Sequence, residues 1–152
     1  MRLLGVSARS GRELARKLID SGYGPTEAEA AVEECRRRGY VNDELLAADS
    51  VSCALDRGAG CRRIRQKLLR RGLAPEVVEQ AVEQNREREP ESARRALAVK
   101  WRSLAAEKDP RKKKARAFRF LVGRGFPPHL AVQLIEEING SGEDLPEHSM
   151  EI

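Results

Sequence analysis

The sequence predicts an all-α protein of three tandem three-helix units, the first lacking most of its opening helix, in an elongated, solenoid-like array. Only 4% of the 152 residues are aromatic, so the core depends on Leu, Val, Ile and Ala, which favours helices over strands. A pattern of basic helix, glycine, apolar residue, proline and second helix occurs three times. Apolar residues in each copy recur three and four positions apart, the spacing of an amphipathic helix.

The repeat is clearest between residues 14–34 and 64–84, which share eight identities in 21 positions. Unrelated sequences would share about one or two at average residue frequencies. In every copy the first helix ends at a glycine, which adopts a left-handed conformation at low cost: Gly22, Gly72 and Gly125. The second helix then opens with a proline, whose missing N–H is not needed in a first turn: Pro25, Pro75 and Pro128.

Further helices are expected between these pairs. Asn42 or Asp43 can cap a helix that runs to about Leu55. Its expected inner face holds Leu45, Ala48, either Val51 or Ser52, and Leu55. The corresponding helix of the third unit is expected at Glu91–Ala106, with an inner face of Ala93, Leu97, Trp101 and Leu104. Met1–Ala8 has the sequence expected for the end of such a helix before the first repeat.

These elements predict repeat boundaries near residues 40, 89 and 139. Repeat 1 then covers residues 1–40, repeat 2 residues 41–89 and repeat 3 residues 90–139. Residues 140–152 are polar and acidic and have no apolar periodicity, so we expect a disordered tail there.

Composition excludes several classes of protein. The apolar runs are too short for a membrane-spanning helix or for the core of a secretory signal. The odd set of Cys35, Cys53 and Cys61 argues against a secreted disulfide scaffold, so we expect reduced thiols in a cytoplasmic protein. The three-fold repeat predicts a monomer in which each unit rests mainly on its neighbours. His129 and His148 have no cysteine or histidine at metal-ligand spacing, and no phosphate-binding glycine loop occurs. We therefore expect no catalytic, cofactor-binding or metal-binding residue.

Basic charge is concentrated on two of the predicted helices. The formal net charge is +5, and neither residues 62–71 nor residues 111–124 contain an acid. The candidate residues for binding a phosphate or an acidic protein surface are Arg62, Arg63, Arg65, Lys67, Arg70, Arg71, Lys112, Lys113, Lys114, Arg116 and Arg119. The alternative is that these cations pair with the acidic helices that follow them, through Glu76, Glu79, Glu83, Glu136 and Glu137.

Three segments resemble RecX, the bacterial family that regulates the RecA recombinase. They are Arg-Ile-Arg-Gln-Lys-Leu-Leu-Arg-Arg-Gly-Leu at 63–73, Gly-Tyr-Val-Asn-Asp-Glu at 39–44 and Phe-Arg-Phe-Leu-Val-Gly-Arg-Gly-Phe at 118–126. The resemblance covers roughly residues 1–138 and implies an all-helical protein of three three-helix repeats. It further implies a regulator in DNA repair, homologous recombination and the SOS response, which lies in the groove of the RecA–DNA filament. Such a protein suppresses ATPase, strand-exchange and coprotease activity by binding, without catalytic residues or a cofactor.

The sequence departs from the family pattern in three places. Cys61 stands where the family has a proline, so we expect a looser turn before the middle basic helix. Leu45 and Leu46 stand where the family favours Arg-Phe. The chain also starts at the family's first helix, with most of that helix absent.

The alternative function is a direct DNA-binding protein made of helix-turn-helix-like units. Reading bases requires Asn, Gln or Arg at exposed N-terminal positions of a helix in the groove. Residues 62–65 and 112–114 supply charge without that polar variety, which suits phosphate or an acidic protein better. Trp101 is interpreted as a core residue, with a base-stacking platform as the alternative.

Overall fold

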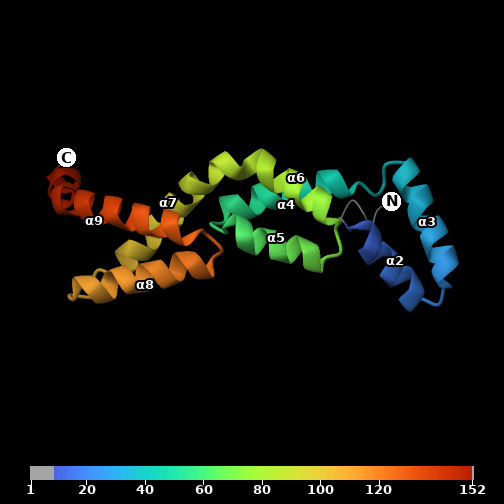
Figure 1. The fold of residues 1–152 in the computed structure, drawn as a ribbon, viewed down its shortest axis with the longest axis horizontal. Helices are drawn as coiled ribbons and strands as arrows, with labels where there is room; N and C mark the ends of the chain where they lie inside the picture. The colour runs from blue at the N-terminus through green and yellow to red at the C-terminus, as the bar shows by residue number, and fades with distance from the viewer. Residues whose placement is uncertain (1–8, 152) are drawn as a thin grey trace. The chain divides into compact units, whose positions relative to one another are not determined.

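The computed structural model describes the backbone of residues 9–151 and the side chains of residues 9–140. Within that range the chain forms helices and no strand, which confirms the predicted all-α class (Figure 1). The helices are α2 (Gly11–Asp20), α3 (Pro25–Arg37), α4 (Asp43–Asp56), α5 (Cys61–Arg70), α6 (Pro75–Asn85), the short 3-10 helix η1 (Arg86–Arg88), α7 (Glu89–Ser103), α8 (Pro110–Gly123) and α9 (Pro128–Glu151). The helix end expected at Met1–Ala8 lies outside the described residues.

The turns of the three repeats form as the sequence predicts. Gly22, Gly72 and Gly125 have φ values of +108°, +90° and +99°, in the region that favours glycine. The prolines at 25, 75 and 128 are the first residues of α3, α6 and α9. The apolar residue after each glycine differs in burial, since Phe126 is fully buried while Tyr23 is 54% exposed.

Helix α4 has the expected extent and a different inner face. The Asn42 side chain accepts a hydrogen bond of 3.0 Å from the Leu45 amide, so Asn42 caps the helix. Ala47, Val51 and Leu55 are fully buried at a spacing of four residues. Leu45, predicted to face inward, is 57% exposed, because it lies about 200° around the helix from Ala47.

Helix α7 begins and ends earlier than Glu91–Ala106, the range predicted for it. It starts at Glu89 because Pro90 is accommodated in the first turn, where its missing N–H has no partner to lose. Its predicted inner residues pack as expected, with Ala93 and Leu97 buried and Trp101 half-buried against the same core.

Helix α9 continues beyond residue 139, where the sequence predicts a disordered tail. The backbone of α9 is helical to Glu151, and the disordered tail expected for residues 140–152 stays a prediction. Adding residues to a helix that has already formed gives one hydrogen bond for each residue fixed, so apolar periodicity is not required for such an extension.

The described residues pack into two compact units. One unit comprises the chain up to Cys53 together with Arg65–Asn85, and its core includes Leu14, Val32 and Val41. The other comprises Ala54–Ile64 and the chain from Arg86 onward. Its core is larger and contains Ala93, Leu97, Leu104, Ala117, Leu121, Phe126, Leu130, Ala131, Leu134 and Ile135. The three repeat boundaries given above remain predictions.

Candidate partner-binding surface

Helix α5 has a buried face and a basic outer face. Cys61, Ile64 and Leu68 are at most 3% exposed and fix the orientation of the helix. The opposite face carries exposed polar and basic side chains: Arg63, Gln66, Lys67 and Arg70. We call these four residues the α5 outer face. Arg63, Lys67 and Arg70 have no ion-pair or hydrogen-bond partner within residues 9–140.

The other predicted cations of this segment have structural roles. Arg65 forms an ion pair with Glu79 of α6. The Arg62 guanidinium donates a hydrogen bond of 3.1 Å to the Val122 carbonyl. The predicted alternative, pairing with the following acidic helix, is therefore correct for Arg65.

Arg71 is held by the first repeat. Its Nε and Nη2 atoms each donate a hydrogen bond of 2.8 Å to the Glu13 carboxylate. This hydrogen-bonded arginine lowers the pKa of Glu13, outweighing the opposing effect of burial. The same contact raises the pKa of Arg71. Arg71 therefore joins α2 to the end of α5 and is not a free binding group.

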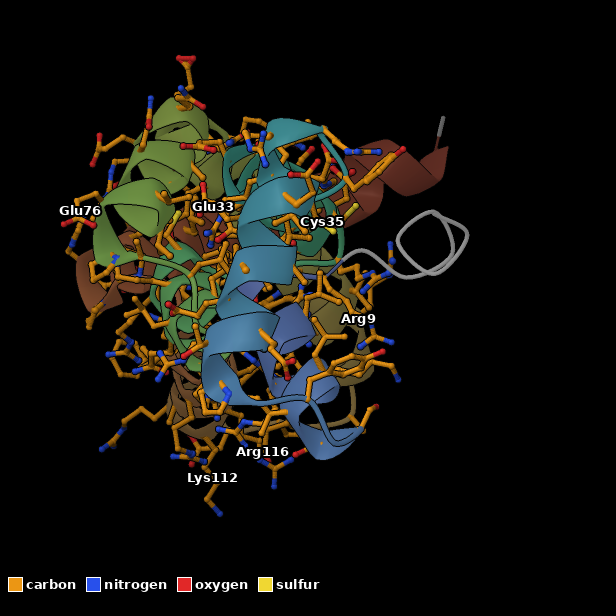
Figure 2. All side chains as sticks on the ribbon, turned by 90° about the vertical axis from the view of Figure 1, so that its right-hand side faces the viewer. Arg9, Glu33, Cys35, Glu76, Lys112 and Arg116 are labelled. Atoms are coloured by element: carbon orange, nitrogen blue, oxygen red, sulfur yellow. The ribbon has the colours of Figure 1, made fainter. Side chains whose placement is uncertain are left out.

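The basic residues of α8 also divide into held and free groups. Lys113 Nζ lies 4.3 Å from the centre of the Trp101 ring, a cation–π contact. Lys114 Nζ lies 3.5 Å from a Glu136 oxygen, and Arg116 lies 3.8 Å from Glu107. Lys112 is exposed and points away from α8 (Figure 2). Lys112 and Arg119 have no charged or hydrogen-bonding partner in the part of the chain with described side chains.

The turn before α5 is held by a hydrogen bond to α7. The Cys61 amide donates a hydrogen bond of 2.8 Å to the buried Glu89 carboxylate. A proline could not make this bond because it has no N–H. The bond ties this turn to Glu89, and the expectation of a looser turn than with proline stays a prediction. The Cys61 thiol is only 2% exposed, so it is a packing group.

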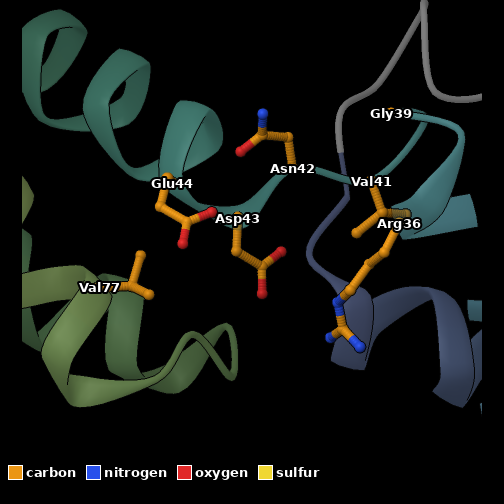
Figure 3. A pocket seen from close by; sticks show the side chains of 7 residues that line it. All are labelled: Arg36, Gly39, Val41, Asn42, Asp43, Glu44 and Val77. Carbon is orange, nitrogen blue, oxygen red and sulfur yellow. The ribbon is translucent and has the colours of Figure 1, made fainter. Parts of the chain in front are cut away.

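A polar hollow of about 390 Å³ lies beside the start of α4 (Figure 3). Its lining includes Arg36, Asn42, Asp43, Glu44 and Val77. Asp43 accepts a hydrogen bond of 3.0 Å from the Gly11 amide, and Asn42 caps α4. Asp43 thus joins α4 to the start of α2, while Asn42 caps its own helix, so both side chains already have structural partners.

Comparison with known proteins gives the family. The family model of the first three-helix domain of RecX matches residues 1–35. The family model of the third three-helix domain matches residues 87–135. A Thermus thermophilus protein named "Regulatory protein RecX" is 37% identical over 142 residues, which cover 92% of each chain. The chain belongs to the RecX family. The Deinococcus radiodurans protein of the same name is 33% identical over 139 residues, which cover 90% of this chain and 65% of that one.

Solved RecX structures have the same fold. The crystal structure of RecX from Lactobacillus salivarius superposes with a TM-score of 0.80 at 18% identity and covers 91% of this chain and 90% of that one. The family is one of regulatory proteins with helical repeats. No helix in the described part of this RecX chain is long and apolar enough to span a membrane.

Sequence reasoning identified the basic helices but not the free cations on them. The signal for Arg65 was present, because Glu79 belongs to the acidic helix that follows. Nothing local in the sequence indicates that Arg71 meets Glu13, which lies 58 positions away. The structure reduces the predicted set to five cations without partners in the described residues: Arg63, Lys67, Arg70, Lys112 and Arg119.

Proposed function

We propose that this RecX chain binds the RecA–DNA filament and inhibits its ATPase, strand-exchange and coprotease activities. Its relatives are named regulatory proteins, and the family resemblance implies a RecA filament as the target. The chain would act by binding, not catalysis, as a monomer and in the cytoplasm.

The observation that carries this proposal is the α5 outer face. Three cations lie on one side of one helix, opposite its buried face, and have no intramolecular partner in the described residues. Free guanidinium and ammonium groups form charge-assisted hydrogen bonds with carboxylates or phosphates. A nucleoprotein filament offers both kinds of group, so the surface is chemically matched to that target.

The test is ATP hydrolysis by assembled RecA–DNA filaments with increasing amounts of the purified chain. Wild type should slow hydrolysis, and Lys67→Glu with Arg70→Glu should weaken this effect by about a hundredfold or more. Each lost charge-assisted bond is worth about 1.5–3 kcal/mol before solvent competition. Both side chains are exposed, so folding should change by no more than about 0.5 kcal/mol for each.

The control reverses Arg37 and Arg38 at the end of α3, which is the same change in net charge. These exposed arginines pair with Glu34, and such surface pairs contribute little to stability. The control should inhibit as well as wild type. Equal loss of inhibition in both variants would mean that bulk charge drives association. Full inhibition by the α5 variant would contradict the proposal that the α5 outer face binds the filament.

Direct binding to free DNA is the second candidate, because the α5 outer face contains no acid. Contacts to phosphate alone weaken steeply with salt. Binding of duplex DNA that persists at raised salt, and is lost in the α5 variant, would favour this second function. Binding that disappears with moderate salt while filament inhibition persists would favour the first.

A further inference from the structure

The third repeat differs from the second at one pair of facing positions. Residues of α5 and α6 correspond to those of α8 and α9 with an offset of 53 positions. In the second repeat this pair is Arg65 and Glu79, which form an ion pair between the two helices. In the third repeat the equivalent residues are Phe118 and Val132.

This exchange leaves an apolar hollow between α8 and α9, which lie side by side (Figure 1). Its volume is about 280 Å³, and Ala115 and Ile135 add to its apolar lining. Val132 is 51% exposed. The second repeat has the same pair of helices with an ion pair at this place, so the repeat does not require apolar residues there. Exposed apolar surface of this kind marks interaction sites.

Basic groups border the hollow along α8. Lys114 and Arg119 belong to its lining, together with one acid, Glu136, which pairs with Lys114. Arg119 has no charged partner within residues 9–140, and neither has Arg111, one turn before Ala115. The hollow thus combines an apolar floor with a border of net positive charge.

We propose that this hollow, the α8–α9 groove, binds an acidic amphipathic helix of a partner protein. A large apolar side chain of that helix would fill the groove, and carboxylates beside it would meet Arg119 and Arg111. The volume lies just below the range of about 300–1,000 Å³ for small-molecule pockets, which suits a side chain. Phe118 packs against the core of its unit, so its ring is less suited to stacking a nucleic-acid base.

The probe is a fluorescein-labelled helical peptide with Leu at positions i, i+3, i+4 and i+7 and Glu at most others. Fluorescence anisotropy should show saturable binding to wild type. Val132→Glu should weaken binding by about tenfold or more, because the new carboxylate would lose water when the peptide binds. The double variant Phe118→Arg/Val132→Glu reproduces the ion pair of the second repeat, and it should also lose binding while keeping its helical circular dichroism spectrum.

The matched control is Val99→Glu. Val99 is a valine of α7 with 61% exposure, and it does not line the groove. This variant should bind the peptide as wild type does. Arg119→Glu should weaken binding of the Leu/Glu peptide and strengthen binding of a Leu/Lys peptide of the same pattern, because the charge at the border of the groove is reversed.

Three results would overturn the proposal. The first is the absence of saturable binding to wild type, or equal loss in the Val132→Glu and Val99→Glu variants. The second is that Val132→Glu abolishes binding of a single-stranded oligonucleotide but not of the peptide. The third is tighter peptide binding after truncation beyond Asn139, because the groove would then be occupied by the chain's own acidic end. None of these measurements depends on inhibition of RecA.

Discussion

Two places in this RecX chain join consecutive basic helices in different ways. At the first joint, the start of α2 meets the end of α5, around Ser10 and Arg71. At the second joint, the start of α5 meets the end of α8, around Gly60 and Arg124. Ser10 and Gly60 are equivalent in the repeat, and so are Arg71 and Arg124.

Both joints use the carbonyl of the arginine that precedes the turn glycine. At the first joint, the Ser10 hydroxyl donates to the Arg71 carbonyl at 3.0 Å. At the second, the Gly60 amide itself donates to the Arg124 carbonyl at 2.7 Å. A side chain mediates the first contact, whereas backbone meets backbone in the second.

The arginines also act differently. Arg71 turns its guanidinium to the Glu13 carboxylate, so the first joint contains an ion pair. Arg124 donates to the carbonyl oxygens of Gly58 and Arg57 at 2.8 and 2.7 Å, with no acid involved. The same repeat position thus gives one joint that depends on the charge of a side chain and another that depends on close backbone approach.

The largest effect is expected from Gly60→Ala. A Cβ at this position would overlap the carbonyl carbon and oxygen of Gly125, so the backbone of the second joint must move apart. We expect a loss of about 3 kcal/mol in the free energy of unfolding, measured with urea. The matched change at the first joint, Ser10→Ala, removes a helix cap and one hydrogen bond and should cost about 1 kcal/mol. Equal costs at the two positions would contradict the comparison.

A smaller effect is expected from Arg71→Ala. Arg71 and Glu13 are about 30% exposed, so the lost pair should cost only about 1–2 kcal/mol, at the lower end for charged hydrogen bonds. Hydrogen exchange should quicken at the amides of residues 10–14 and stay unchanged at residues 60–64. Faster exchange at both places would show that the two joints are not independent.

How far the sequence predicts these joints depends on how local their contacts are. Glycine and proline positions gave the helix ends, because they act through the backbone of their own turn. Arg71–Glu13 and Cys61–Glu89 contacts join residues 58 and 28 positions apart, so no pattern along the chain reveals them. The acidic helix after Arg65 did signal an ion pair, but the sequence did not show which cation of α5 forms it. It therefore could not separate Arg65 from Lys67, which has no partner in the described residues.

The groove and the inner face of α4 illustrate the same limit. The offset of 53 residues between the repeats is visible in the sequence. That Phe118 replaces one member of an ion pair follows only from the structure, in which Arg65 pairs with Glu79. Leu45 fits a helical spacing of apolar residues and still faces outward. In a helix as rich in apolar residues as α4, more than one set of positions has the spacing of a buried face.

Acid should weaken the first joint. The pKa of Glu13 is lowered in the folded chain, so the unfolded chain binds this proton more readily. The resulting stabilisation is present at neutral pH and is lost as the pH falls below the ordinary glutamate range and through the lowered value. The difference in melting temperature between wild type and Glu13→Gln should therefore shrink from pH 7 to pH 3. The control, Glu29→Gln on the exposed side of α3, should show no such pH-dependent difference.

The smallest effect is expected from truncation after Asn139, which leaves both joints complete. Among the residues of α9 whose side chains are described, the last buried ones are Leu134 and Ile135, and Ile138 is half-buried. The removed segment carries a net charge of −4 from Glu143, Asp144, Glu147 and Glu151. The melting temperature should fall by no more than about 2–4 °C, the shift expected for roughly 1 kcal/mol in a chain of this length. Amide exchange at Ser10 and Gly60 should not change. A larger fall would mean that the acidic segment docks on the folded chain, and stronger inhibition of RecA after truncation would make that docking autoinhibitory.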